Sequence, residues 1–552
     1  MRILGIEGTA WAASAAIFET DDSAALTSAT DRTPDPTADH IFIESNPYQP
    51  DSGGIHPREA AEHMGNAIPE VVETALAHAA DRHTGDGPVV DAVAFSRGPG
   101  LGPCLRIVGT AARSVAQTLD VPLVGVNHMV AHLEIGRYQS GFDSPVCLNA
   151  SGANAHLLGY HNGRYRVLGE TMDTGVGNSI DKFTRHVGWK HPGGPKVEAA
   201  AKDGDYVELP YVVKGMDFSF SGIMSAAKDE ADAGTPVEDI SAGLQETIFG
   251  MLTEVAERAL SLTGTDELVL GGGVGNNARL REMLAEMCDQ RGAKFHAPEP
   301  RFLGDNAGMI ALCGARMFAA GDTLAVGDSA VDPNFRPDQV DVTWRGTDES
   351  VARAFTDDGA IRGAEATVDI GPDEVVKRRV PKTYRHPKLD DRLRRERTKA
   401  EARLTSDARR AGVRTPVIQD IDPVEGVITF QNVGDSDLAE RLEPEAVRVV
   451  GEYLARIHDA GIVHGDPTTR NVRVGIGPDG ETQVHLIDFG LGFHTGHVED
   501  QAMDLHVFAQ SVEGTADDAG PLLDALEAGY ESVGSTEVID RLREVESRGR
   551  YR

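Results

Sequence analysis

Short apolar runs alternate with longer amphipathic stretches from residue 1 to about residue 320. The apolar runs have the length of buried strands and lie at residues 89–95, 123–126, 146–150 and 267–270. The amphipathic stretches are long enough for helices and lie at residues 57–80, 105–119, 240–262 and 277–291. Alternation of this kind predicts an α/β domain in which helices cover a sheet.

The pattern changes between residues 322 and 356, a region that is rich in Asp, Pro and Gly and lacks periodicity. Short strand-like runs return around residues 360–376, and a basic helix and another α/β pattern follow them. We therefore expect a first domain over 1–344, a linker over 345–357 and a second domain over 358–552.

The apolar content indicates a folded protein without a membrane segment. No stretch approaches the roughly 18 apolar residues of a membrane span. Glu7 and Gly8 interrupt the apolar N-terminus, so residues 3–6 are better explained as a buried strand than as part of a signal peptide. The four cysteines form no CxxC pair and are expected to be buried. We expect a cytoplasmic location and no membrane partner.

The chain carries a formal net charge of −34, and its acidic residues are spread widely rather than confined to a tail. A chain this acidic should avoid nucleic acid on electrostatic grounds. Adaptation to high salt explains the same excess, and we favour that interpretation. Residues 377–414 run against the trend, with 15 Lys/Arg and 5 Asp/Glu. They form either a solvated helix face or a surface that faces phosphate groups.

A set of residues in the second domain has the spacing of a phosphoryl-transfer site. Asp466 follows His464 and Gly465 and is placed as the catalytic or acceptor-orienting carboxylate. Asn471 can reach a metal from the same loop, and Asp488 of an Asp-Phe-Gly turn is the main candidate metal ligand. Upstream, Lys377 ends a predicted strand and suits a nucleotide phosphate, and Glu401 on the basic helix can pair with it.

These residues and their surroundings resemble the small RIO-like atypical kinase of the KEOPS complex. Residues 377–387, 395–398 and the basic tail 548–552 carry the resemblance over about 358–552. No GxGxxG precedes Lys377; the resemblance places Gly363, Ala364 and Glu365 there to bind ATP with Mg²⁺. No Ala-Pro-Glu follows Asp488, and Pro467 stands where the family usually has leucine.

A second site is predicted in the first domain. His128 and His132 are four residues apart, so on a helix both imidazoles can bind one metal ion. Two surface or capped histidines would give the same spacing. Asp305, at another expected helix start, suits a third metal ligand. Met129 occupies the position of the glutamate in a zincin HExxH motif, which argues against a protease.

Two further segments have the character of ligand-binding loops. Gly271–Gly273 follow an expected strand and precede a helix, where backbone can approach a nucleotide and the helix N-terminus favours phosphate. Ser151, Gly152, Ala153 and Asn154 make a tight turn of a kind that binds phosphate oxygens.

The first domain resembles the ASKHA-fold (actin/Hsp70-like, two-lobed) tRNA threonylcarbamoyltransferase of KEOPS, through about residue 344. The matching motifs lie at residues 5–10, 95–103, 191–195 and 214–222. The resemblance implies that His128, His132 and Asp305 hold one Fe(II) or Zn(II). It also implies a threonylcarbamoyl-adenylate site made of Asn149, Ser151, Gly152, Ala153, Asp181, Gly194, Glu198 and Asn277. Asn149 replaces the tyrosine that usually serves as a metal ligand, and its amide oxygen is a weaker one.

The two resemblances together predict a natural fusion of two KEOPS subunits, of an archaeal and halophilic kind. The expected reaction moves a threonylcarbamoyl group from threonylcarbamoyl-AMP to the adenosine beside the anticodon of tRNA. A Ser/Thr kinase or ATPase module supports it, and other KEOPS subunits are expected partners. Residues 377–414 and the tail 548–552 are hypothetical tRNA contacts. The alternatives are a metal-dependent glycoprotease-type hydrolase and an ATP-binding regulatory scaffold.

Overall fold

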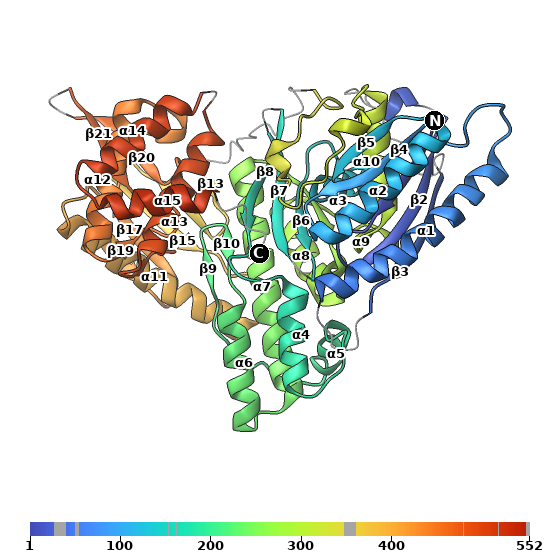
Figure 1. The fold of residues 1–552 in the computed structure, drawn as a ribbon. Helices are drawn as coiled ribbons and strands as arrows, with labels where there is room; N and C mark the ends of the chain where they lie inside the picture. The colour runs from blue at the N-terminus through green and yellow to red at the C-terminus, as the bar shows by residue number, and fades with distance from the viewer. Residues whose placement is uncertain are drawn as a thin grey trace. The chain divides into compact units, whose positions relative to one another are not determined.

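A computed structural model describes the chain at residues 1–21, 23–26, 40–49, 55–152, 154–161, 163–346, 360–477, 480–516 and 518–547 (Figure 1). The chain divides into two compact units. The first unit contains Met1–Val212 and Asp217–Phe355, and the second contains Val213–Met216 and Thr356–Arg550. Three groups of predicted residues lie wholly or partly outside the described ranges: Ala153, the tail 548–552, and the predicted linker 345–357 with the start of the second domain.

The first unit contains a five-stranded mixed sheet in the order β3-β2-β1-β4-β5. Its strands are β1 (Arg2–Glu7), β2 (Ala12–Glu19), β3 (His40–Pro47), β4 (Ala92–Gly98) and β5 (Leu123–Asn127). Neighbouring residues of β1 face opposite sides of this sheet. Leu4 belongs to a core with helices α1 (Pro57–Arg82) and α2 (Gly102–Leu119), whereas Ile3 belongs to a core with α3 (His128–Ser140) and α10 (Ala307–Ala319). The sheet is therefore covered on both faces.

A second sheet of the first unit repeats this arrangement in the order β12-β11-β6-β7-β8. Its strands are β6 (Val146–Ala150), β7 (Ala155–His161), β8 (Arg164–Glu170), β11 (Glu267–Gly271) and β12 (Lys294–His296). In both sheets three antiparallel strands are followed by two parallel ones. The duplicated strand order is the topology that the expected two-lobed domain requires, and the predicted fold class is confirmed.

The remaining elements of the first unit are mainly helices. They are α4 (Val176–His186), α5 (Gly194–Ala200), α6 (Ser221–Ala233), α7 (Val237–Thr263), α8 (Ala278–Arg291) and α9 (Pro300–Leu303), with β10 (Asp217–Phe218) and the 3₁₀ turns η1 (Ser23–Leu26), η2 (Gly273–Asn276), η3 (Val326–Asp328) and η4 (Pro337–Gln339). The short strand β9 (Val213–Lys214) belongs to the second unit. The middle of α7 is buried on all sides, so it is a core helix rather than a surface helix.

The second unit is a small α+β structure. An antiparallel sheet has the order β13-β14-β15-β17-β16. Its strands are β13 (Ala360–Arg362), β14 (Ala366–Ile370), β15 (Glu374–Arg379), β16 (Ile418–Asp422) and β17 (Val427–Gln431), and α11 (Pro387–Arg410) contacts it.

A mainly helical part follows in the chain. It consists of α12 (Pro444–Asp459), α13 (Val498–Glu513), α14 (Gly520–Glu531) and α15 (Thr536–Ser547), together with β18 (Ser436–Asp437), η6 (Leu438–Glu440), β19 (Ile462–Val463), β20 (Val472–Ile476), β21 (Thr482–Leu486) and β22 (Phe493–His494). This division into a sheet part and a helical part is the expected bilobal kinase-like arrangement.

The expected elements are present, with shifted ends. All four predicted helices of the first domain occur, and so do its five predicted strands, including the one at residues 3–6. The strand predicted at 89–95 is wrong at its start, because β4 begins at Ala92. Lys377 does not end its strand, since β15 continues to Arg379. The four cysteines are buried and unpaired, as predicted. Among the described residues, no helix is both long and apolar enough to cross a membrane.

Candidate functional sites

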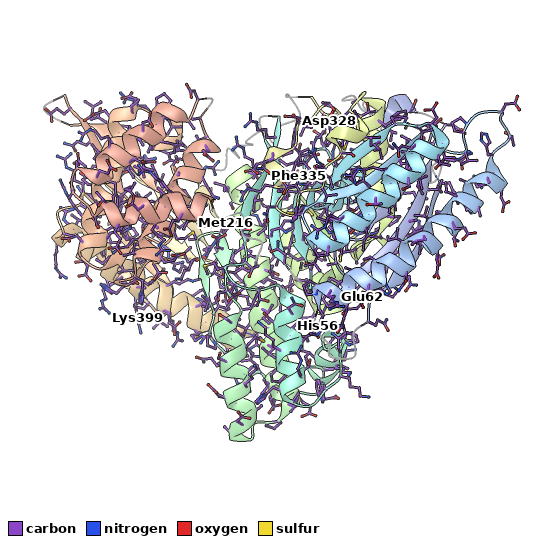
Figure 2. The ribbon with its side chains drawn as sticks, viewed as in Figure 1. His56, Glu62, Met216, Asp328, Phe335 and Lys399 are labelled. Carbon is purple, nitrogen blue, oxygen red and sulfur yellow. The ribbon has the colours of Figure 1, made fainter. Side chains whose placement is uncertain are left out.

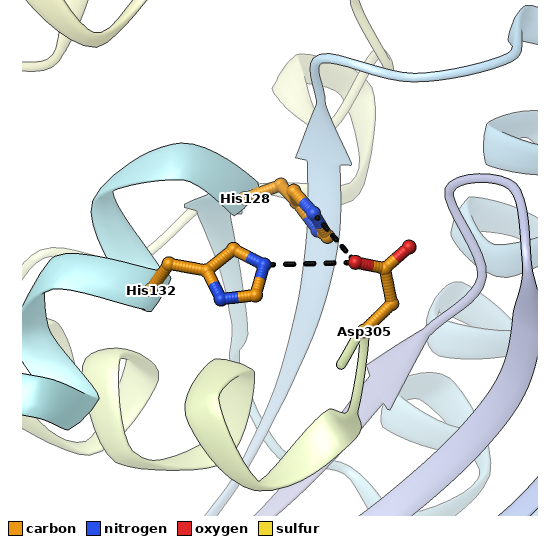
Figure 3. A group of neighbouring side chains, drawn as sticks. All are labelled: His128, His132 and Asp305. Atoms are coloured by element: carbon orange, nitrogen blue, oxygen red, sulfur yellow. Dashed lines mark ion pairs between the residues drawn. The ribbon is translucent and has the colours of Figure 1, made fainter. Parts of the chain in front are cut away.

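The start of α3 and the start of α10 bring three candidate metal ligands together. Asn127 caps α3, because its side-chain oxygen accepts hydrogen bonds from the backbone N–H groups of residues 129 and 130. The helix spacing then places His128 and His132 on one face. Asp305 precedes α10, and its Oδ1 lies 3.3 Å from His128 Nε2 and 3.6 Å from His132 Nε2 (Figure 3). One ligand atom from each residue lies within 4.8 Å of the others.

The electrostatics of this cluster fit a bound cation. Burial lowers the pKa of His132. Burial also acts to lower the pKa of His128, but Glu7 and Asp305 outweigh it and raise that pKa to about 10. Burial would raise the pKa of Asp305, yet the two imidazoles hold it well below its ordinary value. Both ring nitrogens of the buried His132 lack a hydrogen-bond partner in the described part of the chain. Two imidazoles and a carboxylate are a donor set suited to Zn²⁺ or Fe²⁺.

Glu7 contacts the metal cluster and was not predicted as a site residue. Its side chain is fully buried at the end of β1. His128 Nδ1 lies 3.1 Å from its Oε2. The only hint in the sequence was its place in the motif at residues 5–10, since 121 positions separate it from His128.

Asn149 and His156 face each other across the β6–β7 ladder close to the cluster. The side-chain oxygen of Asn149 and both ring nitrogens of His156 are buried and have no hydrogen-bond partner among the described residues. Burial, followed by the neighbouring His132 and His128, lowers the pKa of His156 to about 3.

The turn that follows β6 is tied to the start of α4. Ser151 N–H and Oγ both donate to the carbonyl oxygen of Asn154, which closes the turn. The backbone of Asn178 donates to the carbonyl oxygen of Gly152 at 2.9 Å. Gly272 has φ +83°, and a Cβ there would lie 2.2 Å from the Ala150 carbonyl oxygen. The close approach of β6 therefore explains this glycine without a ligand.

The predicted adenylate residues form two pairs in the structure. Asp181 Oδ1 accepts a hydrogen bond from the backbone of Gly193 at 2.8 Å, directly before Gly194 at the start of α5. Glu198 Oε1 accepts one from Ala278 N–H at 2.9 Å, and Asn277 caps α8 at that point. These contacts hold the ends of α5 and α8 in place.

Trp11 connects the turn with the Asp181 pair. Its indole stacks on the ring of His191, with centroids 5.8 Å apart and planes within 8°. His191 Nδ1 lies 3.1 Å from Asp181 Oδ2. A Cβ at Gly152 would lie 3.3 Å from the indole Nε1. The predicted acyl and adenylate residues thus belong to one continuous region.

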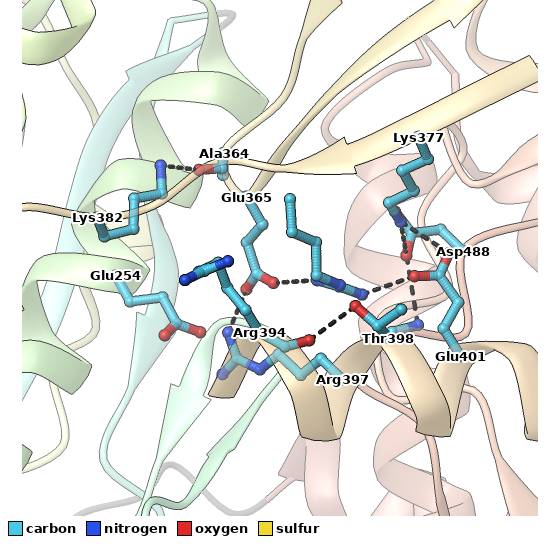
Figure 4. Close-up of polar contacts among 12 residues, drawn as sticks. Glu254, Ala364, Glu365, Lys377, Lys382, Arg394, Arg397, Thr398, Glu401 and Asp488 are labelled. Atoms are coloured by element: carbon cyan, nitrogen blue, oxygen red, sulfur yellow. Dashed lines mark hydrogen bonds and ion pairs between the residues drawn. The ribbon is translucent and has the colours of Figure 1, made fainter. Parts of the chain in front are cut away.

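The second unit contains a chain of alternating charges around Lys377 (Figure 4). Lys377 Nζ lies 2.8 Å from Glu401 Oε1 and 2.6 Å from Asp488 Oδ1. Burial acts to lower the pKa of Lys377, but Asp488 and Glu401 raise it above its ordinary value. Asp488 has φ +64°, a left-handed conformation that is rare outside glycine and found at functional sites. The expected Lys377–Glu401 pair is therefore present.

The segment before β15 is held by ion pairs rather than by glycine-rich backbone. Glu365 accepts from Arg379 and Arg397, each at 2.8 Å. Arg379 Nη2 also lies 2.6 Å from Glu401 Oε2. The carbonyl oxygen of Ala364 accepts a hydrogen bond from Lys382 Nζ, and Gly363 N–H closes the turn by donating to the carbonyl oxygen of residue 366. Glu365 therefore anchors this segment to Lys377 through Arg379 and Glu401.

The catalytic loop holds Asp466 beside Asn471, whose side-chain nitrogen donates to the Asp466 carbonyl oxygen at 2.8 Å and lies 3.2 Å from its carboxylate. Asp504 on α13 is buried and accepts hydrogen bonds from the backbone of His464 and Gly465. Nothing in the sequence pattern signalled Asp504, because it belongs to a distant helix.

The basic segment forms helix α11 over part of its length. Several of its arginines pair along the helix, as Arg394 does with Asp390 and Arg395 with Asp391. Lys399 lies on the same helix (Figure 2) and is exposed, and the side chain of Arg403 is 72% exposed. The segment is therefore compatible both with a solvated helix face and with a surface that faces phosphate groups, since it carries paired cations and exposed ones.

Comparison with known proteins gives one family over the whole chain. The model of the tRNA N6-adenosine threonylcarbamoyltransferase family matches residues 37–312. A relative from Haloarcula marismortui is 67% identical over 556 residues, and the match covers 100% of both chains. Relatives from Haloquadratum walsbyi and Methanospirillum hungatei are 66% and 50% identical, covering 100% of this chain and 100% and 99% of theirs. All three are called probable bifunctional tRNA threonylcarbamoyladenosine biosynthesis proteins.

Proposed function

This chain belongs to the tRNA N6-adenosine threonylcarbamoyltransferase family, and we propose that its first unit moves the threonylcarbamoyl group of threonylcarbamoyl-AMP to the adenosine beside the anticodon of tRNA. The observation that carries the proposal is the cluster of the buried His132 with the half-buried His128 and Asp305, whose ligand atoms lie within 4.8 Å of one another. It lies at the starts of α3 and α10.

Different residues of the first unit bind the metal, the adenylate and the acyl group. His128, His132 and Asp305 hold one Fe(II) or Zn(II), which supplies Lewis acidity toward the acyl donor. Asp181 and Glu198 support the starts of α5 and α8, where Gly194 and Asn277 meet the adenylate. Ser151 and Gly152, with the neighbouring Asn149, face the acyl group.

The second unit is the Ser/Thr kinase or ATPase module of the fusion. Lys377 binds the ATP phosphates, Asp488 and Asn471 bind Mg²⁺, and Asp466 orients the acceptor. The Lys377–Glu401 pair, at 2.8 Å, supports this assignment, since it positions the lysine for phosphate. Gly363 and Ala364 cover the nucleotide, and Glu365 holds that segment in place.

The partners follow from this reaction. The substrates are tRNA, threonylcarbamoyl-AMP and ATP, and other KEOPS subunits assemble with the chain. The exposed cations Lys399 and Arg403 of α11 are proposed to contact tRNA phosphates. Charge reversal at both positions should weaken tRNA binding and flatten its dependence on salt. Unchanged tRNA binding would remove α11 from the tRNA surface.

The direct experiment uses the full chain in high-salt buffer with unmodified tRNA and threonylcarbamoyl-AMP. Mass spectrometry of the digested tRNA should detect threonylcarbamoyladenosine with wild-type protein and none with His132→Ala. His56→Ala, at an exposed histidine of the same unit, is the matched control and should retain product. Each reaction is run with and without the other complex subunits. No product in any mixture would overturn the transferase assignment.

Two other functions make different predictions. A glycoprotease-type hydrolase would release peptides in a reaction that depends on His128, although Met129 replaces the glutamate that such enzymes carry. A regulatory scaffold would need ATP binding but no phosphoryl transfer, so Asp466→Ala would retain all transferase function. The candidate metal ligands His128, His132 and Asp305 favour the transferase over the scaffold, because a scaffold does not require a metal site.

A further inference from the structure

Glu7 is a fully buried carboxylate that three hydrogen-bond donors approach. The backbone N–H of Thr9 donates to Oε1 at 2.8 Å. The hydroxyl of Ser96, on the neighbouring strand β4, donates to Oε2. His128 Nδ1 lies 3.1 Å from the same Oε2. Both oxygens therefore face hydrogen-bond donors of the chain itself.

The two ring nitrogens of His128 have different surroundings. Nδ1 faces Glu7 Oε2, whereas Nε2 lies 3.3 Å from Asp305 Oδ1, inside the ligand cluster. A metal-bound imidazole must offer a lone pair at one nitrogen and can keep a proton only at the other. A carboxylate can only accept, so Glu7 holds the proton at Nδ1 and leaves Nε2 for the cation.

We propose that Glu7 is a positioning residue of the metal site, which orients the His128 ring and keeps its proton on Nδ1 so that Nε2 faces the metal. The proposal rests on the proposed function, because it needs a metal at His128, His132 and Asp305. Ser96 and Thr9 hold the carboxylate in turn. The residue acts from β1, so the first strand of the unit takes part in building the site.

The substitution Glu7→Gln keeps the size of the side chain but removes its charge and one of its two acceptor oxygens. Glutamine has the same size but offers one oxygen and one NH₂ group, so it cannot accept from all three donors. With NH₂ toward His128, it favours a proton on Nε2 and blocks the ligand position. With NH₂ toward Thr9, two N–H groups oppose each other in a buried site and push the side chain away from its position at Nδ1. Either arrangement weakens metal binding.

The test measures binding of Co²⁺ alone to the metal-free full chain in high-salt buffer, by the visible absorption of the bound ion and by chelator competition. We expect Glu7→Gln to raise the dissociation constant about 10- to 100-fold, the usual effect of removing a partner of a metal-bound histidine. Thermal unfolding of the metal-free variant checks that it folds. Glu7→Asp keeps the charge but withdraws it from Nδ1, so it should also bind Co²⁺ more weakly.

One matched variant separates positioning from a general loss of packing. Glu19→Gln makes the same carboxylate-to-amide change on β2 of the same sheet, where Glu19 pairs with Arg2. It should bind Co²⁺ like the wild type. Wild-type affinity in both Glu7 variants, or an equal loss in Glu19→Gln, overturns the proposal and leaves the metal site standing. Absence of Co²⁺ binding by the wild type overturns the metal site itself and Glu7's role with it.

Discussion

Asp504 Oδ2 accepts a hydrogen bond from the backbone N–H of His464 at 2.7 Å. The other oxygen of this carboxylate accepts from Gly465 N–H at 2.8 Å, and Asp504 is nearly fully buried on α13. One side chain therefore satisfies two buried backbone donors of the loop that carries Asp466. The geometry of this loop therefore depends on Asp504, which binds the backbone of the loop and belongs to a different element.

We expect Asp504→Asn to lower ATP hydrolysis by on the order of 10²-fold, because the amide group cannot accept from both N–H groups and the loop shifts. The effect on kcat should exceed the effect on the KM for ATP, since Asp504 acts through the backbone of the loop that carries Asp466. Steady-state kinetics with ATP and Mg²⁺ measure both constants. Asp540→Asn, at an exposed carboxylate on α15, should behave like the wild type. An unchanged kcat in Asp504→Asn would contradict this role.

The Lys377–Glu401 pair should be needed for phosphoryl transfer. Glu401→Gln leaves Lys377 paired with Asp488 alone, at 2.6 Å, and this contact competes with Mg²⁺ for the aspartate. We expect about a 10²-fold loss in kcat/KM for ATP. The same change at the exposed Glu396 of α11 should have no effect. Equal losses of kcat/KM in the two variants would show that activity depends on the helix as a whole and not on the ion pair.

The buried carboxylate of Glu134 should contribute strongly to the stability of the first unit. It pairs with Arg316 and lies 3.5 Å from Arg345 Nη1. Burial would raise its pKa, but the guanidinium groups outweigh burial and lower it to about 2. Glu134→Gln leaves these cations buried without an anion and should cost about 3–5 kcal/mol in the free energy of unfolding. Denaturant titration measures it, with Glu62→Gln as the comparison; its exposed pair with Arg58 is worth at most about 1 kcal/mol.

Mild acid should destabilise the first unit through His156. Burial lowers the pKa of this imidazole to about 3, below the value of about 6.5 for an unfolded chain. The unfolded state therefore binds the proton first as pH falls, and stability present above about pH 6.5 is lost on acidification. Between pH 7 and pH 5 the loss from this residue should be about 2 kcal/mol. The variant His156→Gln should show a smaller loss over this range in denaturant titrations, and His56→Gln should keep the wild-type dependence.

Local patterns were sufficient for the elements and for the ligands that share one element. The predicted helix at 277–291 is α8, with Asn277 as its cap rather than its first residue. His128 and His132 are recognisable together because a helix repeats every 3.6 residues, and this geometry does not depend on the rest of the fold. The Lys377–Glu401 pair could also be predicted from the sequence, since Lys377 lies on one strand and Glu401 on the helix that follows it.

The ends of elements and the long-range contacts needed the tertiary structure. The β4 strand begins at Ala92 rather than at residue 89 because pairing with β1 and β5 sets its ends, and apolar content alone does not. Glu365 was expected to bind nucleotide or Mg²⁺, but two arginines occupy both of its carboxylate oxygens. In this structure Glu365 therefore anchors the segment before β15 and does not present a free carboxylate oxygen to a nucleotide or Mg²⁺.

By itself the sequence determined the class of the fold, the two kinds of site and the residues that chemistry demands within each motif, because these depend on short-range spacing. Only the tertiary structure decided which distant side chains complete them. Glu7 reaches His128 across 121 positions, and Asp504 reaches His464 across 40. Such contacts depend on how sheets and helices pack, and a buried carboxylate becomes informative only when the donors that surround it are known.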